Sequence, residues 1–302
     1  MNEFDNIIAE GNMQKSAPTP QKDKEPFDST KWAEQKQQTR KTAYDLIDTT
    51  AESVSRDSNK FRSYLDVQSR FDRYSIGNAL LVMAQMPEAV QLKDYDAWKE
   101  AETPVKKKQK GINILEPGDE YTREDGTTGV SMNVKRVFDV SQTSSKERPT
   151  AVQFDDRTLL RALVYKAPVQ IIPTEQFNAE NANAYYDHTQ KQILVRKGME
   201  APDIFKATTM ELAHSAFAAN AEEYSRRKEN FKAQCVSYML CKRYGIDTQD
   251  MEIRVPASYS GLTAQEVKGE LSEIRNTTND IAARMSKALE QSKSPKHKDQ
   301  ER

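Results

Sequence analysis

The sequence of 302 residues has few cysteines and no long apolar run. Its two cysteines, Cys235 and Cys241, lie on different faces of an expected helix, which argues against a disulfide scaffold or a cysteine-based zinc site. No run of about 18 apolar residues occurs, which excludes a transmembrane helix. The first residues are acidic and lack a basic region followed by an apolar one, so we expect no secretory signal and a cytoplasmic location.

An excess of charge of either sign is also absent. Lys and Arg total 45 against 46 for Asp and Glu, which gives a net charge of −1. A globally basic nucleic-acid binder is therefore excluded, and any contact with a nucleic acid has to come from a local patch. Charged residues make up 30% of the chain, and the mean hydropathy is −0.85. Because the charges balance, this polarity indicates packed domains with polar tails.

Composition divides the chain into five segments. Polar residues and prolines crowd both ends, so residues 1–29 and 292–302 are expected to be disordered tails. Residues 30–144 are predicted to form an α+β domain, and residues 150–258 a mainly helical domain with a small sheet. Residues 259–291 are predicted to form a C-terminal helix. The predicted fold class is therefore α+β.

Hydrophobic periodicity predicts the individual elements. Helices are expected over residues 31–55, 61–68, 74–86, 93–100, 158–166, 202–219, 229–244 and 263–290. Strands are expected over residues 111–117, 134–140 and 169–172, followed by a hairpin over residues 185–195. Helix ends are marked by Ser29 and Thr30 as N-caps of the first helix, by Gly245 as a stop, and by Thr263 and Glu266 as a capping box of the last helix.

The segment Thr209–His214, with the sequence Thr-Met-Glu-Leu-Ala-His, contains most of a zinc-hydrolase motif. In such enzymes two histidines at positions i and i+4 share one helix face and hold Zn²⁺, and the glutamate after the first histidine is the general base for the metal-bound water. Here Glu211 and His214 are present, but Met210 stands where the first histidine is needed. Taken alone, this pair is also compatible with an ordinary helix.

Two neighbouring patterns accompany this motif. They are a hairpin that ends in Ile-Leu-Val-Arg-Lys-Gly-Met at residues 193–199, and a helix that ends in Cys-Lys-Arg-Tyr-Gly-Ile-Asp at residues 241–247. Together with Glu-Leu-Ala-His they resemble the metallopeptidase-like domain of ArdC-type antirestriction proteins, which are carried by conjugative plasmids and related mobile elements. The resemblance implies a zincin-like fold, and an acidic third ligand on the second helix where this sequence has Gln234.

The resemblance thus implies vestigial rather than intact metal-site residues, namely Met210, His214 and Gln234 at the ligand positions and Glu211 as a vestigial general base. A thioether is soft and uncharged, and a carboxamide offers only a neutral oxygen, so neither binds Zn²⁺ well. Without the metal there is no activated water for Glu211 to deprotonate. We expect no cofactor unless His188 or Cys235 restores a zinc site, and the sequence favours a loss of enzymatic activity while leaving it open.

A group of residues in the first domain is typical of a nucleic-acid surface. Lys106, Lys107, Lys108 and Lys110 form a basic cluster before an expected strand, and four such cations can neutralise several phosphates. Single strands also stack their bases on aromatic rings. The nearest aromatic residues and further cations are Tyr74, Trp98, Tyr121, Phe138, Arg70, Arg73, Lys135 and Arg136. The simpler interpretation is a solvated lysine loop above a hydrophobic core, with Asn78 bracing a neighbouring loop.

The order of patterns in this domain is also similar to the family. Tyr74-Ser-Ile-Gly-Asn78, Trp98, Val105–Pro117 and Val137–Thr143 resemble the N-terminal single-stranded-DNA-binding domain of ArdC-type proteins, and with the second domain the resemblance spans residues 31–247. The nucleic-acid contacts that we predict are Tyr74, Ser75, Asn78, Trp98, Lys106, Lys107, Lys108, Lys110 and Gln142.

The sequence therefore predicts a single-stranded-DNA-binding protein of a mobile genetic element with a catalytically inactive zincin-like domain. By resemblance, its role is antirestriction or the protection of conjugating DNA. Its expected partners are single-stranded DNA and, by the same resemblance, a conjugation or host restriction protein, with no membrane. Two alternatives stay open: an active zinc metallopeptidase with rearranged ligands, and a protein–protein adaptor that uses the altered cleft.

Overall fold

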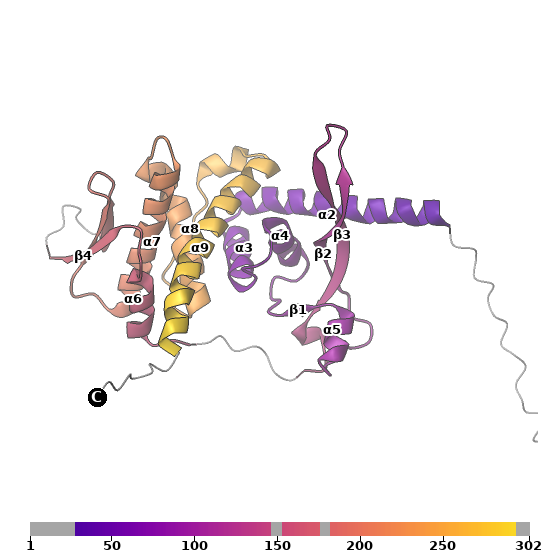
Figure 1. Cartoon of the computed structure of the whole chain (residues 1–302), viewed down its shortest axis with the longest axis horizontal. Helices are drawn as coiled ribbons and strands as arrows, with labels where there is room; N and C mark the ends of the chain where they lie inside the picture. The colour runs from indigo at the N-terminus through magenta and orange to yellow at the C-terminus, as the bar shows by residue number, and fades with distance from the viewer. Residues whose placement is uncertain (1–27, 146–152, 176–181, 294–302) are drawn as a thin grey trace, which may run out of the picture. The chain divides into compact units, whose positions relative to one another are not determined.

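A computed structural model describes residues 28–145, 153–175 and 182–293 of the chain (Figure 1). The predicted tails, residues 1–29 and 292–302, lie almost entirely outside the described residues. The chain divides into two units after Gln38. All elements after the first helix belong to the second unit, and the division of that unit into two domains stays a prediction.

The part of the chain before residue 146 combines helices with a small antiparallel sheet. The helices are α2 (Ser29–Ser55), α3 (Ser58–Arg70), α4 (Ile76–Gln85) and α5 (Tyr95–Glu100). The strands are β1 (Leu92–Lys93), β2 (Ile112–Thr122) and β3 (Thr128–Asp139), in the order β1-β3-β2, and the 3-10 helix η1 (Val140–Gln142) follows them. β2 and β3 form a long hairpin whose turn contains Gly126 at a φ of 82°, a conformation that favours glycine.

The later part of the chain is mainly helical and has a second three-stranded sheet. Its helices are α6 (Asp156–Val164), α7 (Ala201–Asn220), α8 (Arg226–Tyr244), the 3-10 helix η2 (Ala257–Gly261) and α9 (Ala264–Lys293). Its strands are β4 (Gln170–Thr174), β5 (Ala184–Asp187) and β6 (Gln192–Arg196). β6 lies in the middle, parallel to β4 and antiparallel to β5. The predicted α+β fold class is confirmed.

Local sequence signals set most helix ends. Gly245 ends α8 at a φ of 75°, and the backbone N–H of Thr263 donates to the Glu266 carboxylate over 2.8 Å in the capping box before α9, both as predicted. The predicted caps of α2 are wrong. The Asp28 carboxylate accepts from the backbone N–H groups of Thr30 and of the next residue, each over 3.0 Å, and is the N-cap.

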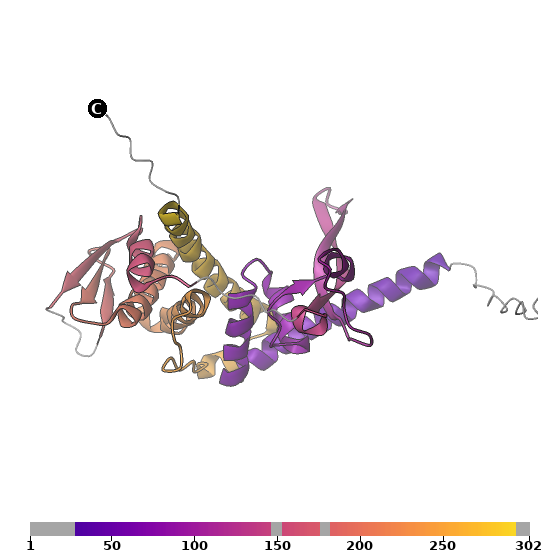
Figure 2. The ribbon, with the colours of Figure 1, turned by 90° about the horizontal axis from the view of Figure 1, so that it is seen from below.

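Helix α9 is part of the hydrophobic core. It packs against α6 and α8 (Figure 2), and its apolar stripe is buried at Leu271, Ile274, Ile281, Met285 and Leu289. No helix in the described part of the chain is long and apolar enough to cross a membrane.

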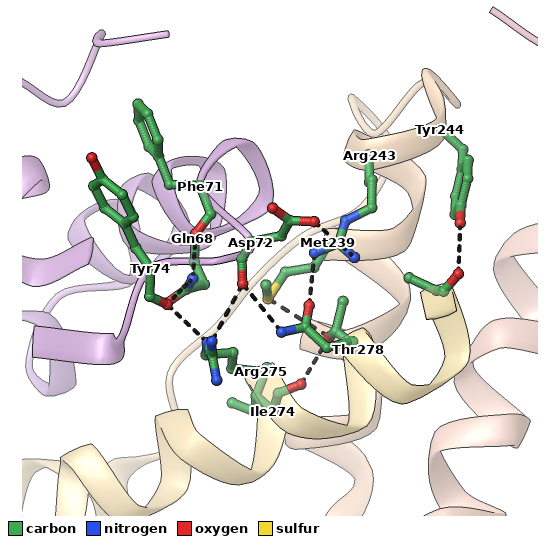
Figure 3. A network of polar contacts seen from close by, with 12 residues as sticks. Gln68, Phe71, Asp72, Tyr74, Met239, Arg243, Tyr244, Ile274, Arg275 and Thr278 are labelled. Atoms are coloured by element: carbon green, nitrogen blue, oxygen red, sulfur yellow. Dashed lines mark hydrogen bonds and ion pairs between the residues drawn. The ribbon is translucent and has the colours of Figure 1, made fainter. Parts of the chain in front are cut away.

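A network of polar contacts joins α9 and α8 to the turn between α3 and α4 (Figure 3). The Arg275 guanidinium donates to the carbonyl oxygen of Tyr74 over 2.9 Å, and the Asn279 amide donates to that of Asp72 over 3.2 Å. Arg243 of α8 donates to the Asn279 side chain over 2.9 Å. The turn that leads into α4 is therefore held by side chains of the C-terminal helix.

Candidate functional site

Helices α7 and α8 bring together the residues that the sequence marked as vestigial metal-site positions. A cavity of about 400 Å³ is lined by Met210 and Glu211 from α7 and by Arg226 and Gln234 from α8, among others. We call it the α7–α8 cleft, after these four residues. His214 lies one turn further along α7 and is fully buried.

The Glu211 carboxylate accepts three hydrogen bonds. It is 3% exposed, and it accepts from both Nη atoms of Arg226, over 2.7 and 2.5 Å, and from the backbone N–H of Tyr186, over 2.7 Å. Two parallel bonds between a guanidinium and a carboxylate are among the strong pairings in proteins. Burial alone lowers the pKa of Arg226, but the bonds and charge of Glu211 outweigh burial and raise it. Glu211 is therefore the anion of a salt bridge, not a free base.

Arg226 was not among the site residues predicted from the sequence. Its guanidinium also lies over the Tyr185 ring, 4.9 Å from the ring centroid. Arginine is not a metal ligand, so no metal-site motif includes it. The sequence offered only an indirect indication of this residue. If Glu211 is buried and the metal ion is lost, its carboxylate needs a cationic side chain in place of the metal.

His214 is held as a neutral imidazole. Its Nδ1 lies 3.0 Å from the hydroxyl of Tyr224. Burial, with a smaller contribution from the positive charge of Arg226, lowers the pKa of His214 from 6.5 to about 4. Burial also raises the pKa of Tyr224 to about 12. Both side chains are therefore uncharged at neutral pH.

This lowered pKa predicts acid sensitivity. Above pH 6.5 the imidazole is neutral in both the folded and unfolded states, whereas between pH 6.5 and 4 only the unfolded state gains a proton. The free energy of unfolding should therefore fall by about 3 kcal/mol between pH 7 and pH 4 because of His214. Urea unfolding followed by circular dichroism checks this, with His214→Gln as the reference. An equal pH slope in both proteins contradicts the assignment.

The residues of the cleft do not fit a divalent metal. The Gln234 amide donates to the carbonyl oxygen of Glu252 over 2.7 Å. Cys235 is fully buried on the core side of α8, and His188 is exposed in the turn after β5. Within the described residues no three His, Cys, Asp or Glu side chains are grouped to hold a metal ion. Donors of this kind, next to a guanidinium, suit no Zn²⁺ site.

Two predicted DNA contacts on α4 have structural roles. Ser75 caps α4 by accepting from the backbone N–H of Asn78 over 3.2 Å. The Asn78 amide donates to the carbonyl of Leu115 over 2.8 Å and accepts from its N–H over 2.7 Å. Gln85 pairs in the same way with Asn113, over 2.9 and 3.0 Å. These amides cover the edge of β2 that β3 leaves unpaired.

The predicted aromatic contacts lie mostly inside the protein. Trp98 is 3% exposed, forms a small core with Phe138 and Val140, and donates its Nε1–H to the carbonyl of Phe138 over 2.8 Å. Tyr74 is half-buried and stacks on Phe71, with 5.2 Å between ring centroids. The ring of Trp98 is therefore not placed to stack on a base, which corrects that prediction.

The lysine cluster lies in a loop, residues Lys106–Gly111, which we call the basic loop. Its backbone is fixed at both ends by Gln142: the N–H of Lys106 donates to the Gln142 carbonyl over 2.9 Å, and the Gln142 amide donates to the Lys110 carbonyl over 2.8 Å. The Gln142 side chain also accepts from the backbone N–H of Asp139 over 2.9 Å. Gln142 is thus a brace of the basic loop.

The fixed loop presents three lysines to solvent. Lys107, Lys108 and Lys110 are exposed, and none of them forms an ion pair within the described residues. Lys106 is also exposed but directs its ammonium to the backbone, with Nζ 3.3 Å from the Ser141 carbonyl oxygen.

The cations that the sequence placed around this loop differ in availability. Lys135 lies 3.0 Å from the Asp94 carboxylate and 3.2 Å from that of Glu116, so its charge is neutralised. Arg73 and Arg136 are exposed. Arg136 lies on β3 with its side chain against Gly111, at the end of the basic loop.

Two exposed tyrosines are better placed for stacking than Trp98. Tyr95, which the sequence analysis missed, is 54% exposed and packs edge-on against Phe138, with 6.4 Å between ring centroids. Tyr121 is 50% exposed on the β2–β3 hairpin. The position of Tyr95 at the start of a short helix gave no sequence signal of exposure.

Comparison with solved structures decides the fold. The Mn(II)-bound crystal structure of the antirestriction protein ArdC from plasmid R388 matches with a TM-score of 0.51 at 16% identity, over 82% of this chain and 98% of that one. The chain has the ArdC fold. The metal-free structure of R388 ArdC matches with a TM-score of 0.48 at 16% identity, over 71% of this chain and 86% of that one.

Sequence comparison adds one distant relative beside ArdC. No protein-family model matches the chain. The uncharacterized protein pXO2-81 of Bacillus anthracis is 19% identical over 326 aligned positions, which cover 88% of this chain and 55% of the relative. The chain thus spans about half the length of this curated relative.

Proposed function

We propose that this protein binds single-stranded DNA through the basic loop and serves a mobile genetic element, by protecting transferred DNA or by countering host restriction. The ArdC fold supports the proposal, because a solved protein with this fold, R388 ArdC, is an antirestriction protein of a plasmid. The proposed place of action is the cytoplasm. A conjugation or host restriction protein is the proposed protein partner.

The fixed geometry of the basic loop carries this proposal. A lysine run that only keeps a loop soluble requires no defined backbone. Here Gln142 braces the loop at Lys106 and Lys110, and the small core of Trp98 and Phe138 lies beside it. The three exposed ammonium groups can each neutralise a phosphate and release condensed counterions, which favours binding at low salt.

Exposed aromatic rings supply the second requirement of a single-strand binder. Stacking of a base on an aromatic side chain contributes about 1–3 kcal/mol. Tyr95 offers a half-exposed ring supported by Phe138, and Tyr121 offers another on the hairpin. Duplex DNA keeps its bases stacked inside, so this arrangement favours single strands.

We further propose that the α7–α8 cleft has no metallopeptidase activity. The R388 structure contains Mn(II), whereas here Met210 and Gln234 occupy two ligand positions implied by the resemblance. The Arg226 guanidinium, bound to Glu211 through both Nη atoms, already supplies the positive charge that the buried carboxylate needs. A divalent cation would meet like-charge repulsion there.

Replacing Lys107, Lys108 and Lys110 together with Gln tests the basic loop. If each lysine contacts one phosphate, the slope of log K against log salt concentration should flatten by about 2. Affinity for oligo-dT at low salt should fall by about 10- to 100-fold. Fluorescence anisotropy of a labelled oligo-dT measures both quantities.

A matched variant removes the same charge elsewhere. Lys191, Lys228 and Lys287 are exposed lysines on the β5–β6 turn, α8 and α9, and replacing them with Gln should leave the salt slope unchanged. An equal loss of affinity in both variants would show that net charge causes the effect, and would contradict the assignment of the basic loop as the DNA contact.

A further inference from the structure

A second cavity, of about 710 Å³, lies on another part of α7. Both α6 and the β4-β6-β5 sheet pack near α7 (Figure 1), and the groove between α6 and β4 has α7 as its floor. We call it the α6–β4 groove. It shares no lining residue with the α7–α8 cleft. Its apolar lining residues are Leu160, Leu163, Val164, Ile171, Pro173, Val195, Ala201 and Ile204.

Part of this apolar lining faces solvent. Val164 is 50% exposed, and Leu160, Ile171 and Ile204 are only partly buried. Scattered apolar residues are normal on protein surfaces, but a contiguous apolar groove of this size is typical of a binding site.

The floor of the groove contains an unused hydrogen-bonding group. Thr208 of α7 is 1% exposed, and its Oγ1 has no hydrogen-bond partner within the described residues. A threonine hydroxyl in a helix can donate to the carbonyl three or four residues earlier, as Thr209 does to Phe205 over 2.8 Å. A buried hydroxyl without a partner costs stability. A ligand that brings an acceptor to this hydroxyl would recover the cost.

The rim of the groove is basic. Arg157 and Arg161 lie one turn apart on α6, are exposed, and form no ion pair within the described residues. Arg196 and Lys197 line the opposite side, and Asp156 is the acidic lining residue. Lys197 has a partner, with its Nζ 3.4 Å from the Glu175 carboxylate. The unpaired positive charge is therefore on the α6 side.

We propose that the α6–β4 groove is a docking site for an acidic amphipathic helix of a partner protein. Such a helix would bury an apolar stripe at positions i, i+3, i+4 and i+7 against Leu160, Val164 and Ile204. Its carboxylates would face Arg157 and Arg161. Because part of its lining is exposed to solvent, the groove suits a ligand with one apolar and one polar face. A wholly apolar small molecule would leave apolar surface in water.

Selection from a phage-displayed library of random 16-residue peptides tests this proposal. The wild-type protein is the bait, and the Val164→Asp variant is used for subtraction, because Val164 is exposed enough for the change to preserve the fold. We expect the enriched peptides to be acidic and to carry large apolar residues at helical spacing. The most enriched sequence, synthesised with a fluorescent label, is the probe for anisotropy.

The peptide should bind Val164→Asp at least about tenfold more weakly than wild type, and Arg157→Gln/Arg161→Gln about fivefold more weakly. Replacing Lys107, Lys108 and Lys110 with Gln should leave peptide binding unchanged, and Val164→Asp should bind oligo-dT normally. Failure of this proposal and failure of DNA binding are thus distinguishable. Three results would contradict the docking site. They are that no peptide is enriched after subtraction, that the enriched peptides are basic, or that the labelled peptide binds Val164→Asp as tightly as wild type.

Discussion

Replacing Arg226 with Met is expected to lower the free energy of unfolding by about 3 kcal/mol, because the Glu211 carboxylate would stay buried without a counter-charge. The range for breaking such pairs is about 3–5 kcal/mol, and we expect the lower end because the Arg226 side chain is 32% exposed. Urea unfolding at pH 7 measures the change. Arg226→Lys should lower the free energy of unfolding by less, since lysine keeps the positive charge but cannot form the two parallel bonds.

A double variant separates the salt bridge from packing. Glu211→Gln removes the buried charge and keeps an oxygen that can accept from the Tyr186 N–H, so Glu211→Gln/Arg226→Met should recover most of the loss seen in Arg226→Met. The coupling energy of the cycle should be about 2 kcal/mol or more. Additive effects of the two substitutions would show that the ion pair does not stabilise the cleft.

Restoring a metal site should require the removal of Arg226 as well as the return of the ligands. Met210→His with Gln234→Glu rebuilds the ligand set that the resemblance implies, but the Arg226 charge still opposes a cation. Adding Arg226→Ser frees Glu211 and removes that charge. We expect the triple variant to bind Zn²⁺ at least about 100-fold more tightly than the double variant.

Isothermal titration calorimetry with Zn²⁺ measures this difference. Adding His214→Ala to the triple variant should abolish the gain, which makes it the matched control. If the triple variant binds Zn²⁺ no better than wild type, the assignment of Met210 and Gln234 to ligand positions is wrong.

Local sequence patterns predicted most of the elements, since their causes lie within a few residues. Gly245 and the Thr263–Glu266 box act over single turns, and each ends or begins a helix as expected. The β2–β3 hairpin was predicted too short. Its distal part, around Tyr121 and Val130, is exposed on both faces, so it lacks the alternation that marks a half-buried strand.

The roles of the site residues depend on partners far away in the chain. Asn78 pairs with the backbone of Leu115, 37 residues later, and Gln142 braces a loop 32 residues earlier. Arg226 approaches Glu211 only because α7 and α8 pack together. The residue types and their spacing within one helix or strand do not predict contacts with a distant part of the chain. The sequence therefore named the candidate residues but could not decide between nucleic-acid contacts and structural roles for Asn78, Trp98 and Gln142.

One titration tests most directly whether the protein binds single-stranded DNA without a metal ion. Anisotropy of a labelled oligo-dT of about 20 nucleotides, longer than a typical single-strand site, is followed with wild-type protein in EDTA and in Mn²⁺, with a duplex as comparison. We expect salt-sensitive binding that prefers the single strand and is the same in EDTA and in Mn²⁺. No binding at about 50 mM salt, or binding that requires Mn²⁺, would contradict a DNA-binding basic loop beside a metal-independent cleft.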